Sequence, residues 1–303
     1  MSRLLAEVGK YLAIRRALGF KLERAGVFLP RFVAHLEANH SRLITSRLAL
    51  DWARQPPNGH PQWWAERLSI VRGFAKYLQA EDHRHEVPAS DRIPSHELRR
   101  AVPVLFSASE VSALLYAASR ERLPLVAGTY KTLFGLLAAT GMRVGEAIRL
   151  ERDDVDWKAK LLVVRQSKFG KSREVMLHPS AMRALARYAK LRDAYHPRSQ
   201  SPRFFLSLVG TPLIYNSIQN SFQRLARAAS IRAGRLHDLR HSFAVGTLLR
   251  WYRKGVDVDT RMPRLSTYLG HVDPKSTYWY LHASPELMGI VCKKLERAQR
   301  SGS

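Results

Sequence analysis

Two tyrosines that could act as nucleophiles lie one residue apart near the carboxyl end of the chain, in LGHVDPKSTYWYLH, residues 269–282. A tyrosine hydroxyl can attack an electrophile when a neighbouring group accepts its proton. If residues 274–281 form a helix, Tyr278 and Tyr280 point about 200° apart, because each residue turns the helix by ~100°. The two hydroxyls therefore cannot both face one site.

A second stretch, LHDLRHSFA at residues 236–244, combines histidines with an arginine. His237 and His241 are four residues apart and share one face of a helix, and Arg240 is three residues from His237. The pattern is similar to the H-E-x-x-H helix of zinc proteases, but Asp238 stands where that motif requires glutamate. A histidine and an arginine aimed together suit a phosphodiester better than a zinc ion.

Charged side chains at two further places could act on the same kind of substrate. In ATGMRVGEAIRL, Arg143 lies in the first turn of a predicted helix, and Glu146 follows three residues later on the same face. Lys168 ends a predicted strand and Lys171 lies in the turn that follows, where a rigid strand can aim an amine at a ligand. The simpler interpretations are a surface ion pair and solvated turn lysines.

The elements that must position these side chains are mostly helical. Ser107 is followed three residues later by Glu110 and then an apolar run, which is the signature of a capped helix and marks the start of a domain. Apolar spacing predicts helices over residues 125–139, 143–150, 180–194, 215–229, 238–250, 263–270, 274–281 and 285–300. An extended loop is expected at residues 250–268.

One segment breaks the helical pattern. Residues 161–168 and 172–177 are rich in β-branched and apolar side chains, and the Phe-Gly-Lys sequence at residues 169–171 predicts a hairpin turn between them. The fold class is therefore mainly α with a small antiparallel β-sheet.

The first 90 residues predict a small helical module with basic polar faces. Apolar residues recur at helical spacing in residues 8–39 and 63–82, and the intervening residues 55–62 contain three prolines and a glycine, as loops do. Residues 91–104 have the composition of a basic linker. We therefore divide the chain into residues 1–90, the linker, and a second domain at residues 105–303.

The charge of the chain indicates a polyanionic partner. There are 50 Lys and Arg residues against 25 Asp and Glu, a net charge of +25 that is spread along the whole chain, which favours nucleic acid over a membrane surface. No apolar run approaches the roughly 20 residues that cross a bilayer, so a cytoplasmic protein is expected. Cys292 is the only cysteine, which excludes an intrachain disulfide and a zinc site built on several cysteines.

Taken in chain order, these motifs resemble one family. R-x-x-E at Arg143, the hairpin lysine, H-x-L-R-H at residues 237–241, L-G-H ending at His271 and a tyrosine nine residues later are together similar to the tyrosine recombinase (phage integrase) family. The resemblance covers about residues 105–285. It implies a two-domain recombinase, with a helical core-DNA-binding (SAM-like) domain followed by a mixed α/β catalytic domain.

The resemblance also implies an activity and partners. The expected activity is site-specific DNA recombination or integration, in which strands are cut and rejoined through a 3′-phosphotyrosine intermediate without metal, ATP or another cofactor. The expected partners are a double-stranded recombination site and further copies of the chain, as a tetrameric synapse docked through the tail at residues 284–303. A mobile element and a location at the nucleoid are implied in the same way.

The resemblance assigns the chemistry of strand cleavage residue by residue. Tyr280, by its spacing from His271, matches the nucleophile, which leaves Tyr278 for packing or a DNA contact. Arg143 and Arg240 match the two arginines that stabilise the pentavalent transition state.

Proton transfer and support are assigned to the remaining motif residues. Lys168 matches the hairpin general acid, with Lys171 as the competing choice on the same turn. His237 would help to accept the tyrosine proton, and His271 would hydrogen-bond a non-bridging oxygen. Two supporting residues complete the set: Glu146 would orient a catalytic histidine, and His241 would brace the helix that carries Arg240.

Other basic residues are expected to contact DNA. They are Arg15, Arg16, Lys21, Arg72, Lys76, Arg99, Arg100, Lys171 and Arg173. Two alternatives share this chemistry or this fold: a non-catalytic DNA-binding protein, and an enzyme similar to type IB topoisomerases that relaxes DNA. The complete catalytic set disfavours the first, and the helical amino-terminal arm disfavours the second.

Overall fold

The structure is a computed structural model that describes residues 3–55, 57–93, 103–165, 172–271, 275–282 and 287–289. The chain divides into two compact units, Met1–Ala101 and Val102–Ser303. Each unit buries a hydrophobic core of its own. No described helix is long and apolar enough to span a membrane.

The first unit is built from helices that bury an apolar face. Its α-helices, in chain order, are α1 (Arg3–Ala17), α2 (Glu23–Ala38), α3 (Ser46–Ala53) and α4 (Pro61–Gln79). Phe32 of α2 and Phe74 of α4 are fully buried in their shared core. The apolar spacing did not predict the break between α1 and α2, where Gly19 adopts a φ of 86° that favours glycine. It also missed α3, which Thr45 caps by accepting a hydrogen bond from the Leu48 amide.

A small antiparallel sheet interrupts the helices of the second unit. Its strands, in spatial order, are β1 (Val155–Asp156), β2 (Leu161–Val164) and β3 (Arg173–Met176). The register pairs Leu162 with Val175, and both side chains are buried because they lie on the same face of the sheet. The predicted hairpin is confirmed, while its turn at residues 166–171 lies outside the described residues.

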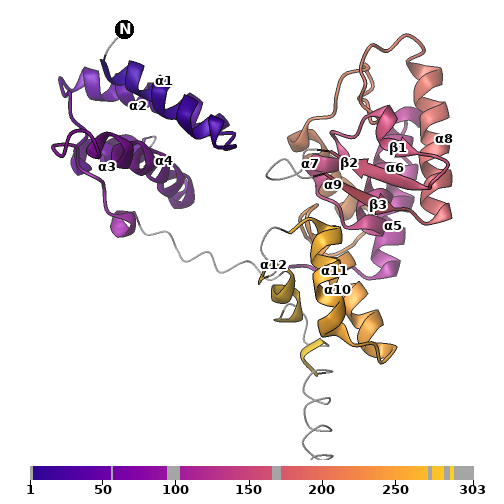
Figure 1. Ribbon diagram of the computed structural model, residues 1–303. Helices are drawn as coiled ribbons and strands as arrows, with labels where there is room; N and C mark the ends of the chain where they lie inside the picture. Colours follow the sequence, from indigo (N-terminus) through magenta and orange to yellow (C-terminus); the bar gives the residue numbers. More distant parts are fainter. Residues whose placement is uncertain are drawn as a thin grey trace, which may run out of the picture. The chain divides into compact units, whose positions relative to one another are not determined.

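Helices form the rest of the described second unit (Figure 1). They are α5 (Ala108–Ser119), α6 (Pro124–Thr140), α7 (Val144–Ala147), α8 (Pro179–Tyr195), α9 (Tyr215–Ala228), α10 (Asp238–Arg253), α11 (Val258–Leu269) and α12 (Lys275–Tyr278), which a 3₁₀ turn η4 (Trp279–His282) follows. The predicted capping box starts α5, since Ser107 and Glu110 each hydrogen-bond the other's backbone N–H. The fold class predicted from the sequence is therefore confirmed.

The extended loop expected at residues 250–268 is wrong. α10 continues to Arg253, and α11 begins at Val258 after a short turn. Pro263 lies inside α11, but four apolar side chains at helical spacing hold that helix against α10; these are Val258, Met262, Leu265 and Leu269. Burial of this face outweighs the local preference of proline for a helix end.

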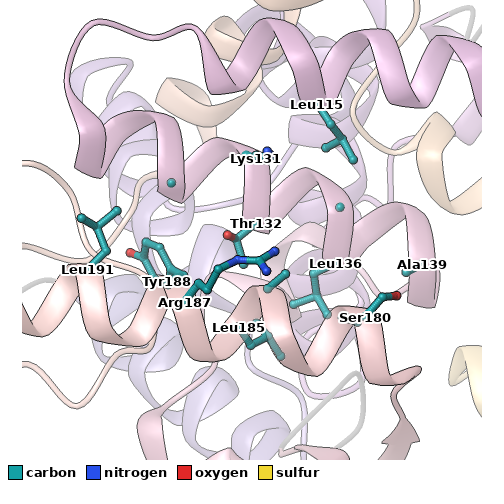
Figure 2. Close-up of a pocket in the computed structure, with 14 residues that line it drawn as sticks. Leu115, Lys131, Thr132, Leu136, Ala139, Ser180, Leu185, Arg187, Tyr188 and Leu191 are labelled. Atoms are coloured by element: carbon teal, nitrogen blue, oxygen red, sulfur yellow. The ribbon is translucent and has the colours of Figure 1, made fainter.

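An apolar cavity of about 330 Å³ lies between α6 and α8. Gly128 and Gly135 of α6 line it. Leu185 and Tyr188 of α8 contribute to its walls (Figure 2). None of the described catalytic candidates lines this cavity. The candidate site lies elsewhere, where α6, α10 and α11 end or begin.

Candidate active site

Arg240 of α10 is held between the ends of two other helices. It is 2% exposed, and its Nη1 donates to the Gly141 carbonyl at 2.8 Å while its Nη2 donates to the Leu269 carbonyl at 2.7 Å. Both carbonyls are available because α6 and α11 end there, and the last carbonyls of a helix have no partner within it. Two helix ends thus fix the orientation of one guanidinium.

Arg143 stands at the amino-terminal end of α7, where it meets Glu146. Its Nη1 donates to Glu146 Oε1 and its backbone N–H donates to Glu146 Oε2, at 2.8 and 2.9 Å. Its Nη2 donates to the Gly270 carbonyl at 2.8 Å. The predicted Arg143–Glu146 neighbours are therefore in contact, and the pair is tied to the end of α11.

Glu146 does not make the contact that we expected. Its carboxylate oxygens accept from Arg143 and from Arg173, and no hydrogen bond to a histidine is found for it among the described residues. The side chain is 2% exposed. Burial raises the pKa of Glu146, but hydrogen bonds and charge from Arg173 and Arg143 outweigh it and lower the value to about 2. Glu146 is therefore an ionised partner of arginines rather than a support for a histidine.

Arg173 of β3 was expected to contact DNA, and the structure places it inside the site instead. Its side chain is 10% exposed. Nη1 and Nη2 donate to the two Glu146 oxygens at 3.0 and 2.8 Å, and Nε donates to the Tyr268 carbonyl at 2.8 Å. The partners of Arg173 are 27 and 95 residues away along the chain, so no local sequence pattern indicates this role.

The carboxyl-terminal end of α11 therefore collects three guanidinium groups. The carbonyls of Tyr268, Leu269 and Gly270 accept from Arg173, Arg240 and Arg143, in that order. The negative end of a helix dipole favours such cations. No side-chain motif marks these acceptors in the sequence, since all three are backbone oxygens.

Tyr280 lies beside this cluster and Tyr278 does not. Tyr280 is 2% exposed, whereas Tyr278 is 42% exposed. The Tyr280 ring is stacked on His271 with centroids 6.0 Å apart, and it meets the His241 ring edge-on at 5.5 Å. The two tyrosines thus have different surroundings, as predicted, although the α-helix expected over residues 274–281 ends at Tyr278 and Tyr280 lies in the 3₁₀ turn η4.

Tyr280 also interacts with Arg240. Burial is the largest cause of the lowered pKa of Arg240, about 10, and the Tyr280 hydroxyl opposes it through charge and a hydrogen bond. Because that pKa stays well above 7, Arg240 remains a cation at neutral pH. A cation therefore lies beside the Tyr280 hydroxyl in this structure.

The two candidate histidines are neutral at physiological pH. Burial, followed by the charges of Arg240 and Arg143, lowers the pKa of His271 to about 3. Burial, followed by the charge of Arg240, lowers the pKa of His237 to about 4. His271 Nδ1 lies 2.7 Å from the Thr277 hydroxyl, which fixes the ring. Both imidazoles can therefore act as hydrogen-bond partners or proton acceptors.

His241 packs between the helix that carries it and the tyrosine segment. Its ring centroid is 4.8 Å from that of His237 and 5.4 Å from that of Trp279. It follows Arg240 directly in α10, so these ring contacts link the arginine helix to the η4 turn that carries Tyr280.

The remaining predicted site residues fall in three groups. Lys168, Lys171, Arg99 and Arg100 lie outside the described residues. Arg16, Lys21 and Lys76 are exposed on the first unit. Arg15 and Arg72 are half-buried there, the first 3.9 Å from the centroid of the Phe20 ring and the second donating to the Pro88 carbonyl. Within the described ranges, no cluster of three or more His, Cys, Asp or Glu side chains could hold a metal ion.

Comparison with protein families and curated proteins finds close relatives. Residues 105–286 match the model described as the phage integrase family. The chain is 42% identical over 309 residues to the putative integrase/recombinase y4rB of Sinorhizobium fredii, which covers 98% of both chains. It is 35% identical to y4rE of the same species, over 97% of this chain and 96% of that protein. The tyrosine recombinase XerC of Alcanivorax borkumensis is 29% identical over 71% of this chain and 67% of its own length.

Comparison with solved structures gives the same fold at lower identity. The Tn1549 transposon integrase in complex with transposon right end DNA has a TM-score of 0.65 at 16% identity, over 96% of this chain and 98% of that chain. The site-specific recombinase XerH bound to palindromic difH substrate has a TM-score of 0.62 at 17% identity, over 97% and 96%. At these identities the likeness shows the architecture alone.

Proposed function

This chain belongs to the phage integrase family of tyrosine recombinases and is a site-specific DNA recombinase, and from that premise we propose that Tyr280 is the nucleophile that cuts and rejoins DNA. The observation that carries the proposal is the burial of Tyr280 against Arg240 and His271, with Tyr278 left exposed. A nucleophilic hydroxyl needs a positive group at the phosphate and a proton acceptor nearby, and Tyr280 has both types of group around it.

In the proposed cleavage step, the phenolic oxygen of Tyr280 forms a bond to the scissile phosphorus while the bond from phosphorus to the 5′-oxygen breaks. The product is a 3′-phosphotyrosine link and a free 5′-hydroxyl. The energy of the phosphodiester is kept in the covalent link, so rejoining requires only attack by a 5′-hydroxyl. We propose that the step uses no metal, ATP or other cofactor.

Two arginines would carry the charge of the transition state. Arg143 and Arg240 hold their guanidinium groups against the end of α11, and guanidinium pairs well with the non-bridging oxygens of a phosphate. A guanidinium has five N–H groups, so each can keep its backbone acceptors and still donate to a phosphate. Donors fixed before the substrate arrives need no reorganisation during the reaction.

Histidines and a lysine would move the protons. His237 is neutral at physiological pH and would accept the Tyr280 proton. His271, whose Nδ1 is engaged by Thr277, would donate from Nε2 to a non-bridging oxygen. Lys168 would protonate the leaving 5′-oxygen, with Lys171 as the alternative on the same turn.

The partner of the proposed reaction is a double-stranded recombination site. The net charge of +25 suits a polyanion, and the names of the structural relatives describe complexes with DNA. We propose that residues 1–90 form the core-DNA-binding domain, residues 91–104 the linker and residues 105–303 the catalytic domain. We further propose a tetrameric synapse on DNA, docked through residues 284–303, in the cytoplasm at the nucleoid.

The test is a nicked duplex that carries the cognate site, selected beforehand from random sequence, with the nick beside the scissile phosphate. After cleavage, the short fragment that carries the free 5′-hydroxyl diffuses away, so the strand cannot be rejoined. The covalent adduct is thereby trapped and survives denaturation. We expect an adduct from wild type and Tyr278→Phe and none from Tyr280→Phe. An adduct lost only with Tyr278→Phe would assign the nucleophile to the other tyrosine.

The same experiment separates the alternatives. Tight binding of wild type without any adduct would support a non-catalytic DNA-binding protein. An adduct with relaxation of supercoiled DNA, but without exchange between two sites, would support an activity similar to type IB topoisomerases. Strand exchange between two labelled duplexes supports recombination.

A further inference from the structure

Arg173 connects three parts of the site that come from different elements. It projects from β3, its terminal nitrogens grip both oxygens of Glu146, and its Nε donates to the Tyr268 carbonyl at the end of α11. This is the planar, two-pronged contact that arginine makes and lysine does not. With 10% of its side chain exposed, Arg173 offers little surface to a DNA backbone.

Glu146 passes the effect of Arg173 to Arg143. Its Oε1 accepts from Arg143 Nη1 at 2.8 Å and from Arg173 Nη1 at 3.0 Å, so one oxygen joins the two arginines. The carboxylate is buried and ionised. Together with the Gly270 carbonyl, it therefore fixes where the Arg143 guanidinium lies.

The charges of this cluster explain why a second arginine is needed. Glu146 alone would neutralise Arg143 and lower its attraction for a phosphate. With Arg173 present, two guanidinium groups share one carboxylate, and one positive charge remains. Arg173 also holds the Glu146 carboxylate from the side of β3.

We propose that Arg173 is a positioning residue for DNA cleavage: it fixes the Glu146 carboxylate against β3 and the end of α11, and thereby holds the Arg143 guanidinium in place for the scissile phosphate. The inference rests on the proposed function, because it assigns Arg143 to that phosphate. In this proposal Arg173 acts only by positioning Arg143, and it does not contact DNA itself.

The test is a double-mutant cycle on the full-length protein with the nicked duplex. The rate of adduct formation is measured for wild type, Arg173→Ala, Arg143→Ala and the double variant, and the Kd for uncut duplex is measured in parallel. We expect Arg173→Ala to lower the rate about 10- to 100-fold, as small misplacements of catalytic groups do. We expect its Kd to change less than about 3-fold and its effect in the Arg143→Ala background to be less than about 3-fold.

Two further variants distinguish positioning from general stability. Arg173→Lys restores the charge without the planar fork, so we expect a rate between those of wild type and Arg173→Ala. Arg165→Ala is the matched control. Arg165 belongs to the same hairpin as Arg173, but its ion-pair partner is the buried Asp154 and not Glu146. We expect Arg165→Ala to leave the rate within about 3-fold of wild type.

A folding defect is handled by a paired substitution. Arg173→Ala leaves Glu146 with one partner fewer in a buried position, which destabilises a protein. Arg173→Met with Glu146→Gln removes both charges and keeps the volume filled. We expect this variant to unfold at a temperature close to that of wild type and still to cleave about 10- to 100-fold more slowly, because the ionised carboxylate is gone and only the Gly270 carbonyl then holds the Arg143 guanidinium.

Three outcomes would overturn the role of Arg173. An equal loss of rate in both Arg143 backgrounds would show that Arg173 acts independently. A higher Kd of Arg173→Ala for uncut duplex, with a salt dependence of the affinity whose slope is smaller by about 1, would show a direct phosphate contact. Absence of any adduct from wild type would overturn the proposed function and this role with it, and the wild-type lane distinguishes that result from the first two.

Discussion

Arg240 combines deep burial with a positive charge. It is 2% exposed, and its pKa of about 10 keeps it protonated at neutral pH. A buried cation is costly unless it is hydrogen-bonded, and here two carbonyls and the Tyr280 hydroxyl meet that need before DNA arrives. The cation that a phosphate requires is therefore already in place in the DNA-free protein.

The lowered pKa of His237 leads us to expect that the folded protein loses stability in mild acid. Its pKa is near 6.5 in the unfolded chain and about 4 in the folded protein. As the pH falls below 6.5 the unfolded state binds the proton first, so stability that is present above that pH is lost progressively towards pH 4. For this partly exposed group we expect a loss of about 1 kcal/mol between pH 7 and 5.

The measurement is chemical denaturation of the DNA-free protein at pH 7 and 5. His237→Gln should reduce the pH dependence, whereas His83→Gln, at an exposed position of the first unit, should leave it unchanged. Equal pH dependence in wild type and His237→Gln would contradict the expectation.

Single residues show what the sequence could and could not predict. The spacing of Tyr278 and Tyr280 was sufficient to place them in different surroundings, because helical geometry is local. The contact of Arg173 with Glu146 could not be predicted, because it exists only when β3 and α7 come together in the fold. The Arg143–Glu146 contact, three residues apart, was predictable from spacing, whereas contacts between distant segments were not.

At the scale of elements, the ends of α6 and α11 build the site. Both end in a glycine of left-handed conformation, Gly141 with φ of 62° and Gly270 with φ of 68°, which exposes carbonyls to the arginines. Apolar spacing predicted long helices such as α6, α8 and α9. The continuation of α10 and the start of α11 were not predicted, because Gly255 and Pro263 indicate a loop locally and tertiary packing overrides them.

Gly270→Ala should damage the site through this helix end. An added Cβ would carry the penalty of a positive φ and would lie 2.8 Å from Arg173 Nη1. We expect a loss of about 1–2 kcal/mol in unfolding free energy and slower adduct formation. Gly255→Ala is the matched control, since Gly255 has φ of 67° and nothing lies within 4 Å of its added Cβ.

Both variants should lose a similar amount of stability from the backbone, and only Gly270→Ala should also lose cleavage rate. Thermal unfolding and adduct assays compare them directly. Equal cleavage rates for the two would show that displacement of Arg173 does not matter.

At the scale of the whole molecule, the net charge of +25 predicts binding that depends steeply on salt. Each phosphate that a basic side chain neutralises releases counterions, so the logarithm of the affinity falls linearly with the logarithm of the salt concentration. Lys76 of α4 is exposed and was expected to contact DNA. Lys76→Ala should reduce the magnitude of that slope by about 1.

The comparison is a salt titration of Kd for wild type, Lys76→Ala and Lys10→Ala. Lys10 is the control because it already forms an ion pair with Glu7 at 2.8 Å. An unchanged slope for Lys76→Ala would remove Lys76 from the DNA contacts of the first unit.

The three carbonyls at the end of α11 have a consequence for how this protein can change over evolution. Every amino acid supplies the same carbonyl oxygen, so substitutions at positions 268 and 269 that preserve the helix end also preserve the acceptors. Selection on this contact therefore acts on the path of the main chain, and side chains there can drift without loss of the arginine array. Comparing sequences column by column would miss this support, and superposing backbones would reveal it.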